Sequence, residues 1–258
     1  MIYVVEPADG YDEEHATTVG ARLATSLARV CSGTSGEPAL WQVDAALRPE
    51  GKQGPLVRTL ASHVAYYERW AKTWEFQALL KARTVAGDRE LGRAYEEAIA
   101  PFVWSAAGRE NFVEDSQAMR RRVEAHVPAA EADRQLKLGK GGLRDVEFTV
   151  QLLQLVHGRS DDSIRSRSTL TALAELAAAG YVGREHAARL GVCYRFLRSL
   201  EHRIQLFRLR RTHLLPTADD ELRRLARSLG MRTAGAAGLP ARCRATRRGE
   251  RGGLQAGS

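Results

Sequence analysis

The chain has 258 residues, of which 44% are hydrophobic and 27% are charged. This balance is typical of a globular protein and excludes a collagen-like or wholly disordered chain. Lys and Arg number 39 against 31 Asp and Glu, which gives a net charge of +8. Residues 232–258 contain six Arg and one Glu, or +5, so the first 231 residues carry only +3 (8 − 5). A dedicated nucleic-acid binder usually carries its basic excess in the folded part, so we expect no nucleic-acid partner.

The three cysteines, Cys31, Cys193 and Cys243, are too few and too scattered for a disulfide framework or a cysteine metal site. No apolar run approaches the roughly 18 residues that a membrane span needs. The N-terminus also lacks the basic and apolar regions of a secretory signal. We therefore expect a soluble, cytoplasmic protein with no membrane partner.

The first part of the chain mixes strand and helix patterns. Residues 1–5 form a β-branched and aromatic run that predicts a buried strand, and residues 13–31 have the spacing of an amphipathic helix. A second strand is predicted over 40–44 and a short third one at 56–57, before helical spacing from residue 60. Residues 1–105 are therefore predicted to form a small α/β portion.

The rest of the chain is predicted to be helical, with helices near 89–107, 110–126, 143–157, 168–179, 184–212 and 218–229. The predicted fold class is α+β, with a helical bundle over 106–231. Residues 232–258 show no hydrophobic period, and we predict a disordered basic tail. An alternative is that this tail contacts an anionic partner.

The first candidate site surrounds Asp44. A carboxylate between apolar residues of a strand is costly to bury unless it binds a metal ion or pairs with a cation such as Arg48. A solvated or purely structural Asp at a strand end is the alternative. Residues 77–86 fit either a helix end or a strand. As a strand, they would project Lys81 and Arg83 together, suited to a triphosphate.

The second candidate site is the glycine-rich motif of residues 137–148, which leads into a helix. Free N–H groups at a helix N-terminus attract anions, and Lys137, Lys140 and Arg144 add charge suited to phosphate. The glycine spacing is not that of a Walker loop. Alternatively, Arg144 and Glu147 pair with each other or with other helices and only fix the packing.

Three motifs in this order resemble one protein family: Val43–Gly51, Trp74–Arg83 and Gly141–Phe148. They are similar to motifs of the bifunctional glutamine synthetase adenylyltransferase/adenylyl-removing enzymes, and the similarity extends from residue 1 to about residue 230. The resemblance implies a nucleotidyltransferase-fold sheet followed by a helical domain. In this family one half attaches AMP to a tyrosine of glutamine synthetase, and the other removes it by phosphorolysis and releases ADP.

Residues 151–159, 166–168 and 200–205 resemble the N-terminal, deadenylylating half, in the manner of actinobacterial members. The family holds Mg²⁺ with two carboxylates of a Gly-Ser-x-Asp-x-Asp turn and one on a later strand. The resemblance implies that Asp44 is this later carboxylate, with catalytic and metal-binding roles. It also makes Arg48, Lys81 and Arg83 candidates for nucleotide phosphate contacts. In the helical domain, the matching motif residues are Lys140, Arg144, Asp145 and Glu147.

The Gly-Ser-x-Asp-x-Asp turn does not occur in this sequence, and in the family it precedes the strand that here begins at Met1. We therefore expect an incomplete sheet and a fragment without catalytic activity of its own. The implied partners are glutamine synthetase, ATP or ADP, and phosphate, with a PII-type signal protein as a further candidate. The alternative is a non-catalytic helical module that docks on glutamine synthetase or on a PII-type protein.

Overall fold

The computed structural model describes residues 1–33, 42–209, 211–231 and 238–255. The chain divides into two compact units, Met1–Glu110 and Asn111–Ser258. The sequence placed this boundary between residues 105 and 106. Each unit is described by itself.

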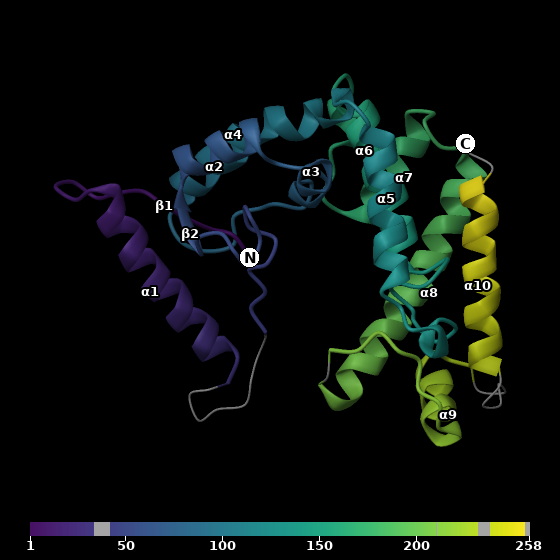
Figure 1. Ribbon diagram of the computed structural model, residues 1–258. Coiled ribbons are helices and arrows are strands. Elements are labelled where there is room, and N and C mark those ends of the chain that lie inside the picture. The colour runs from purple at the N-terminus through teal and green to yellow at the C-terminus, as the bar shows by residue number, and fades with distance from the viewer. Residues whose placement is uncertain (34–41, 210, 232–237, 256–258) are drawn as a thin grey trace. The chain divides into compact units, whose positions relative to one another are not determined.

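The first unit is built on a two-stranded parallel sheet of β1 (Tyr3–Val5) and β2 (Val57–Thr59), in which Tyr3 lies opposite Val57. The long helix α1 (Glu13–Cys31) packs on both strands (Figure 1). Its approach depends on Gly20, because a Cβ atom there would lie 2.7 Å from Cγ1 of Val5. The strand at the start of the chain and the amphipathic helix are as predicted.

Three further helices complete this unit: α2 (Leu60–Arg69), α3 (Thr73–Leu79) and α4 (Arg89–Ser105). Rings from α2 and α4 form its aromatic core. His63 stacks against Tyr67 and meets the ring of Tyr95 edge-on, and the two tyrosine hydroxyls are 3.1 Å apart. These three rings are therefore used for packing.

The structure corrects the strand predicted over 40–44 and, of the two alternatives for residues 77–86, shows the helix end. Residues 42–44 form no strand, while residues 40 and 41 lie outside the described residues. The segment 77–86 is the end of α3 followed by a turn and an irregular stretch. In both places a short apolar run is compatible with several backbone conformations, because no period distinguishes them.

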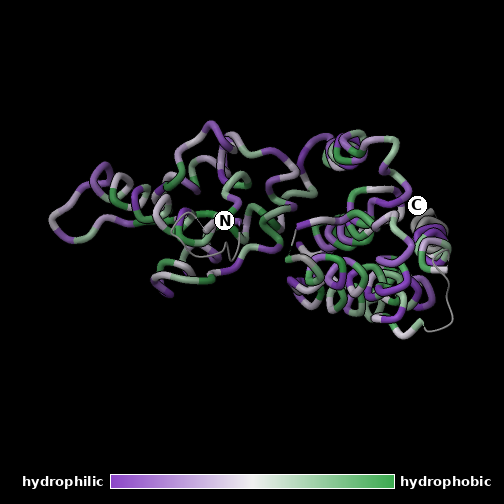
Figure 2. Tube along the Cα trace, turned by 90° about the horizontal axis from the view of Figure 1, so that it is seen from below, coloured by the Kyte–Doolittle hydropathy of each residue, from purple (hydrophilic) through white to green (hydrophobic). Residues whose placement is uncertain are grey.

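The second unit is helical, with α5 (Phe112–Ala125), α6 (Leu143–His157), α7 (Thr169–Ala178), α8 (Arg184–Arg208), α9 (Asp219–Ser228) and α10 (Gly238–Gln255). Short 3₁₀ turns occur at Ala106–Gly108 in the first unit and at Ala129–Glu131 and Asp162–Ile164 in the second. Helix α8 is central and packs against α6, α7, α9 and α10. In Figure 2 the helices of this unit carry both apolar and polar residues, as amphipathic helices do. The buried core includes Leu143, Leu176, Leu197 and Leu200.

The predicted disordered tail needs correction, because residues 238–255 form α10, which packs along α8. Leu239, Cys243 and Arg247 are buried and recur every four residues, on one face of the helix. The guanidinium group of Arg247 donates hydrogen bonds to the carbonyls of Lys140, Ala132 and Asp133. Composition alone missed the helix because, over residues 238–248, its buried positions hold Leu239, Cys243 and a cation, Arg247, that carbonyl oxygens satisfy. Residues 232–237 and 256–258 lie outside the described residues.

Among the described residues, no helix combines the length and the apolar character needed to cross a membrane.

Candidate functional site

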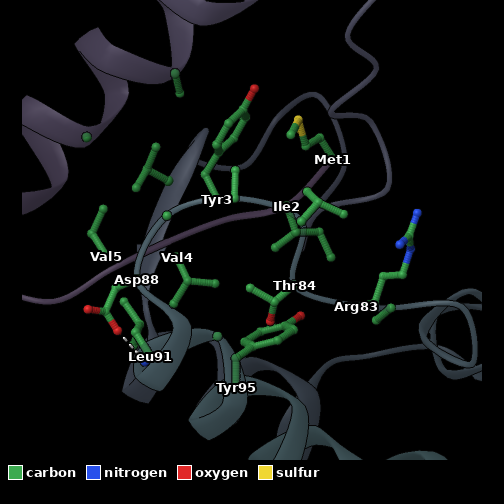
Figure 3. Close-up of a pocket in the computed structure, with 18 of the residues that line it drawn as sticks. Met1, Ile2, Tyr3, Val4, Val5, Arg83, Thr84, Asp88, Leu91 and Tyr95 are labelled. Carbon is green, nitrogen blue, oxygen red and sulfur yellow. Dashed lines mark hydrogen bonds between the residues drawn. The ribbon is translucent and has the colours of Figure 1, made fainter.

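A cavity of about 710 Å³ lies in the first unit, between α1, β1, the segment 81–88 and the start of α4 (Figure 3). Its walls are largely apolar, from residues such as Val4, Leu23 and Leu91. The segment begins at the turn after α3 and ends at Asp88, whose carboxylate accepts hydrogen bonds from the first backbone N–H groups of α4. The cavity is therefore fixed by the helix cap on one side and by the sheet on the other.

Lys81 and Arg83 both line this cavity, so the structure brings these two predicted residues together. They lie on the irregular stretch after α3 and not on a strand. The two residues thus line the same cavity because of the path of the chain after α3, and not because alternate residues of a strand point to the same side. Contact with a nucleotide phosphate stays a prediction for both residues.

Asp44 is not among the residues that line the cavity, although it contacts Met1, which is one of them, and its side chain is exposed. Its Oδ1 atom accepts a hydrogen bond from the backbone N–H of Ala46 at 2.9 Å, and its carbonyl accepts one from the N-terminal amine of Met1. The carboxylate thus fastens a local turn. The expected strand, with Asp44 buried between apolar neighbours, is not formed.

The described residues do not fit a magnesium site around Asp44. They contain no group of three or more His, Cys, Asp or Glu residues that could hold a metal ion. Glu50, the acidic residue closest to Asp44 in sequence, pairs with Arg58. With one exposed carboxylate, this part of the chain supplies at most one ligand of such a site, and we derive no chemical step through a metal.

The guanidinium group of Arg48 makes its hydrogen bonds within its own loop. Its guanidinium group donates to the backbone carbonyls of Ala45, Lys52, Gly54 and Pro55, at 2.9 to 3.3 Å. These bonds use all three nitrogens of the group. The structure therefore gives Arg48 the role of holding the loop of residues 45–55 together, which differs from the predicted phosphate contact.

In the second unit, the glycine-rich motif is tied to α5. Asp145 accepts a hydrogen bond from the backbone N–H of Gly141 at 2.6 Å and binds Arg120 of α5 through its other oxygen. Lys140 pairs with Glu124, also on α5, at 3.2 Å. Asp145 and Lys140 thus position the loop before α6.

Glu147 points toward α8, where Arg198 binds its carboxylate and the hydroxyl of Tyr194 donates to it at 3.1 Å. Arg144, one turn earlier on α6, is 4.0 Å from the other carboxylate oxygen. Glu147 thus has a cationic partner within α6 and another on α8, while a phosphate contact of Arg144 stays a prediction.

A second buried carboxylate joins this cluster. Glu201, on α8, is 2% exposed and binds Arg198, and its other oxygen lies 2.7 Å from Nδ1 of His213. Glu201 lies in the family-like segment 200–205, but no role was predicted for Arg198 or His213. The spacing of Arg198 and Glu201, one helical turn apart, is the signal that could have found them.

The cluster perturbs the proton equilibria of its members. Burial acts to raise the pKa of Glu201, but hydrogen bonds from His213 and Arg198 outweigh it and hold the pKa at about 2. Burial would lower the pKa of Arg198, yet Tyr194 and Glu147 raise it. Burial lowers the pKa of Lys137, and the charge of Arg144 adds to this effect. Around neutral pH Glu201 is therefore ionised, and Arg198 carries its charge.

Comparison with known proteins matches both units to family models. The model described as glutamate-ammonia ligase adenylyltransferase matches residues 1–98, and the model described as GlnD PII-uridylyltransferase matches residues 117–249. Both models describe nucleotidyltransferases, and this is the class to which the α+β chain belongs. The second match covers part of α10, so residues up to 249 fit the family pattern.

The relatives are more specific. The chain is 66% identical over 232 residues to the bifunctional glutamine synthetase adenylyltransferase/adenylyl-removing enzyme of Streptomyces avermitilis, which covers 90% of this chain and 23% of the relative. The enzyme of the same name from Streptomyces coelicolor is 64% identical over 242 residues, which cover 93% of this chain and 24% of the relative. That from Mycobacterium avium is 61% identical over 224 residues, which cover 86% of this chain and 22% of the relative. The chain belongs to this family of bifunctional enzymes, and it spans about a quarter of the length of these relatives.

Proposed function

We propose that this chain is one part of an enzyme that regulates glutamine synthetase by attaching AMP to a tyrosine or removing it by phosphorolysis. The observation that carries the proposal is the 66% identity over 90% of the chain to an enzyme named for both activities. The small parallel sheet with its helices is consistent with part of a nucleotidyltransferase fold. ATP or ADP, phosphate and glutamine synthetase are the proposed reactants.

The described residues do not supply the reaction centre by themselves, because Asp44 is an isolated exposed carboxylate. We therefore propose that the chain is catalytically incomplete by itself and that magnesium chemistry requires carboxylates that it does not contain. Lys81 and Arg83 remain the proposed contacts to nucleotide phosphates, because both line the cavity of the first unit.

The test is a chimera in which this chain replaces the matching segment of the Streptomyces avermitilis enzyme. We expect the chimera to release ADP from adenylylated glutamine synthetase when phosphate is present, and the isolated chain to release none. Asp44→Asn in the chimera should abolish this release while AMP attachment continues, which would also assign the chain to the deadenylylating half. A chimera that folds but lacks both activities would contradict the assignment, and an unaffected D44N chimera would remove Asp44 from the reaction centre.

A second function is favoured by the match of residues 117–249 to a model named for PII uridylylation. On this proposal, the helical unit docks on glutamine synthetase or on a PII-type signal protein without catalysing a reaction. Surface plasmon resonance with each immobilised partner tests it. Absence of binding to both partners, by a chain whose helical circular dichroism is intact, would rule the docking function out.

A further inference from the structure

The charged cluster of the second unit contains more cations than carboxylates near the start of α6. Three permanent or nearly permanent cations, Lys137, Arg144 and Arg198, surround two carboxylates, Glu147 and Glu201. Arg198 binds both carboxylates, and each carboxylate has a further partner in Tyr194 or His213. The carboxylates are thus satisfied without Lys137, which leaves a positive excess on one side of the cluster.

Lys137 has no counter-ion in contact. It is half-buried, and no carboxylate of the described residues lies within ion-pair distance of its amine. Burial lowers its pKa, as does the charge of Arg144, while Glu201 and Glu147 act in the opposite direction. A partly desolvated ammonium group without an ion pair is costly, so an anion at this position would stabilise it.

The side chain of Arg144 has a hydrogen-bond donor that its contacts in the described part of the chain do not use. Its backbone N–H donates to the carbonyl of Lys137 at 3.0 Å, which holds the two residues together. Its side chain lies over the ring of Phe148 and reaches Glu147 only at 4.0 Å. The Nε atom of Arg144 is buried and has no hydrogen-bond partner in the described part of the chain. Buried N–H donors normally find an acceptor, so this atom indicates that one is missing.

Gly142 lets the loop pack closely against the start of α6. A Cβ atom at Gly142 would lie 2.7 Å from the carbonyl oxygen of Leu136 and 3.0 Å from that of Lys137. Glycine at this position therefore lets the segment with Lys137 lie directly against the start of α6. The backbones of Lys137 and Arg144 are consequently held together by these contacts.

We propose that Lys137 and Arg144 form a binding site for a phosphate group at the start of α6. Phosphate fits better than a carboxylate, because it carries more charge and has more oxygens for the ammonium and guanidinium donors. Inorganic phosphate and the phosphate of a nucleotide share this chemistry. The site belongs to the helical unit, whereas Asp44 belongs to the first unit, and binding can be measured without any transfer activity. Its failure is therefore distinguishable from failure of the proposed function.

The experiment is calorimetric titration of the 258-residue chain with inorganic phosphate, AMP and ADP, with acetate as the singly charged control. We expect binding of phosphate or of a nucleotide phosphate, and none of acetate at the same concentration. Lys137→Gln and Arg144→Gln should each weaken binding about tenfold or more, because each removes a charge-assisted hydrogen bond. Tighter binding of AMP than of phosphate would identify a nucleotide as the source, and the reverse order would identify free phosphate.

The matched control is Arg189→Gln, which also removes one positive charge, at an exposed position of α8 outside the loop. It should change the affinity less than twofold. If K137Q does not fold, the Nζ and Cε resonances of Lys137 in the unmodified chain provide the readout, and they should shift on addition of phosphate but not of chloride. Absence of phosphate binding, equal effects of all three substitutions, or unchanged Lys137 resonances would each overturn the proposal.

Discussion

Arg198 on α8 binds the carboxylate of Glu147 on α6 and that of Glu201 one turn further along its own helix. A single guanidinium group therefore neutralises two carboxylates whose side chains are only 11% and 2% exposed. This contact joins the helix that follows the glycine-rich loop to the central helix of the unit.

Replacement of Arg198 by methionine should destabilise the second unit strongly. The substitution keeps an unbranched side chain but leaves two buried carboxylates without their shared cation. Breaking a buried ion pair in this way costs about 3–5 kcal/mol. Urea unfolding followed by circular dichroism measures the loss. Arg195→Met, at an exposed position of the same helix, is the control and should change the free energy of unfolding by less than about 0.5 kcal/mol. Equal stabilities of the two variants would show that the cluster is not a stabilising feature.

Acidification should weaken the first unit through His63. This side chain is 1% exposed, and burial lowers its pKa to about 4, although the nearby backbone of Tyr3 acts to raise it. The unfolded chain, with a histidine pKa of 6.5, binds the proton more readily, so stability falls as the pH drops from 6.5 toward 4. The full effect is about 3 kcal/mol from this shift.

The measurement is the free energy of unfolding of the chain between pH 4 and pH 7, with His63→Phe as the test variant. The phenylalanine keeps a ring in the aromatic core but cannot be protonated, so the slope in this range should become shallower. His15→Gln, at an exposed position of α1, should leave the slope as it is. A slope that is the same in H63F and in the unmodified chain would refute the assignment.

Features that depend on a local residue pattern could be predicted from the sequence. Features that depend on contacts between residues far apart in the sequence could not. β1 and α1 follow from β-branched residues and an amphipathic period, and both are present. The conformation around Asp44 depends on a turn held by Arg48, whose five carbonyl contacts have no periodic signature. Lys81 and Arg83 meet at one cavity, but the reason is the path of the chain between α3 and α4. The Arg198 cluster was missed because Glu147 and Arg198 are far apart in sequence.

Gly20→Ala should destabilise the first unit, although alanine favours helices. A helical Gly→Ala change contributes up to about 1 kcal/mol of stabilisation when space is available. Here the added methyl group would lie 2.7 Å from Cγ1 of Val5 and 3.1 Å from Cγ1 of Val57, so α1 must move away from the sheet. Overpacking of this kind typically costs about 1–3 kcal/mol.

Thermal unfolding of G20A should therefore occur at a lower temperature than that of the unmodified chain. Ser26→Ala, on the exposed side of α1, is the control and should be neutral or slightly stabilising. The double variant with Val5→Ala removes the nearest methyl groups and should recover part of the loss, because the two positions are in contact. A stabilising effect of G20A alone would mean that α1 does not pack on β1 as described.

Arg247 should be essential for the docking of α10. Its guanidinium group holds the carbonyls of Lys140, Ala132 and Asp133, and it is 6% exposed. Arg247→Gln leaves these carbonyls without donors and should loosen the helix from α8. Two consequences are measurable: faster hydrogen exchange of the α10 amides, and faster alkylation of Cys243, whose thiol pKa burial raises to about 11. Arg244→Gln removes the same charge at an exposed position and should change neither rate. Rapid exchange of these amides in the unmodified chain would instead restore the prediction of a disordered tail.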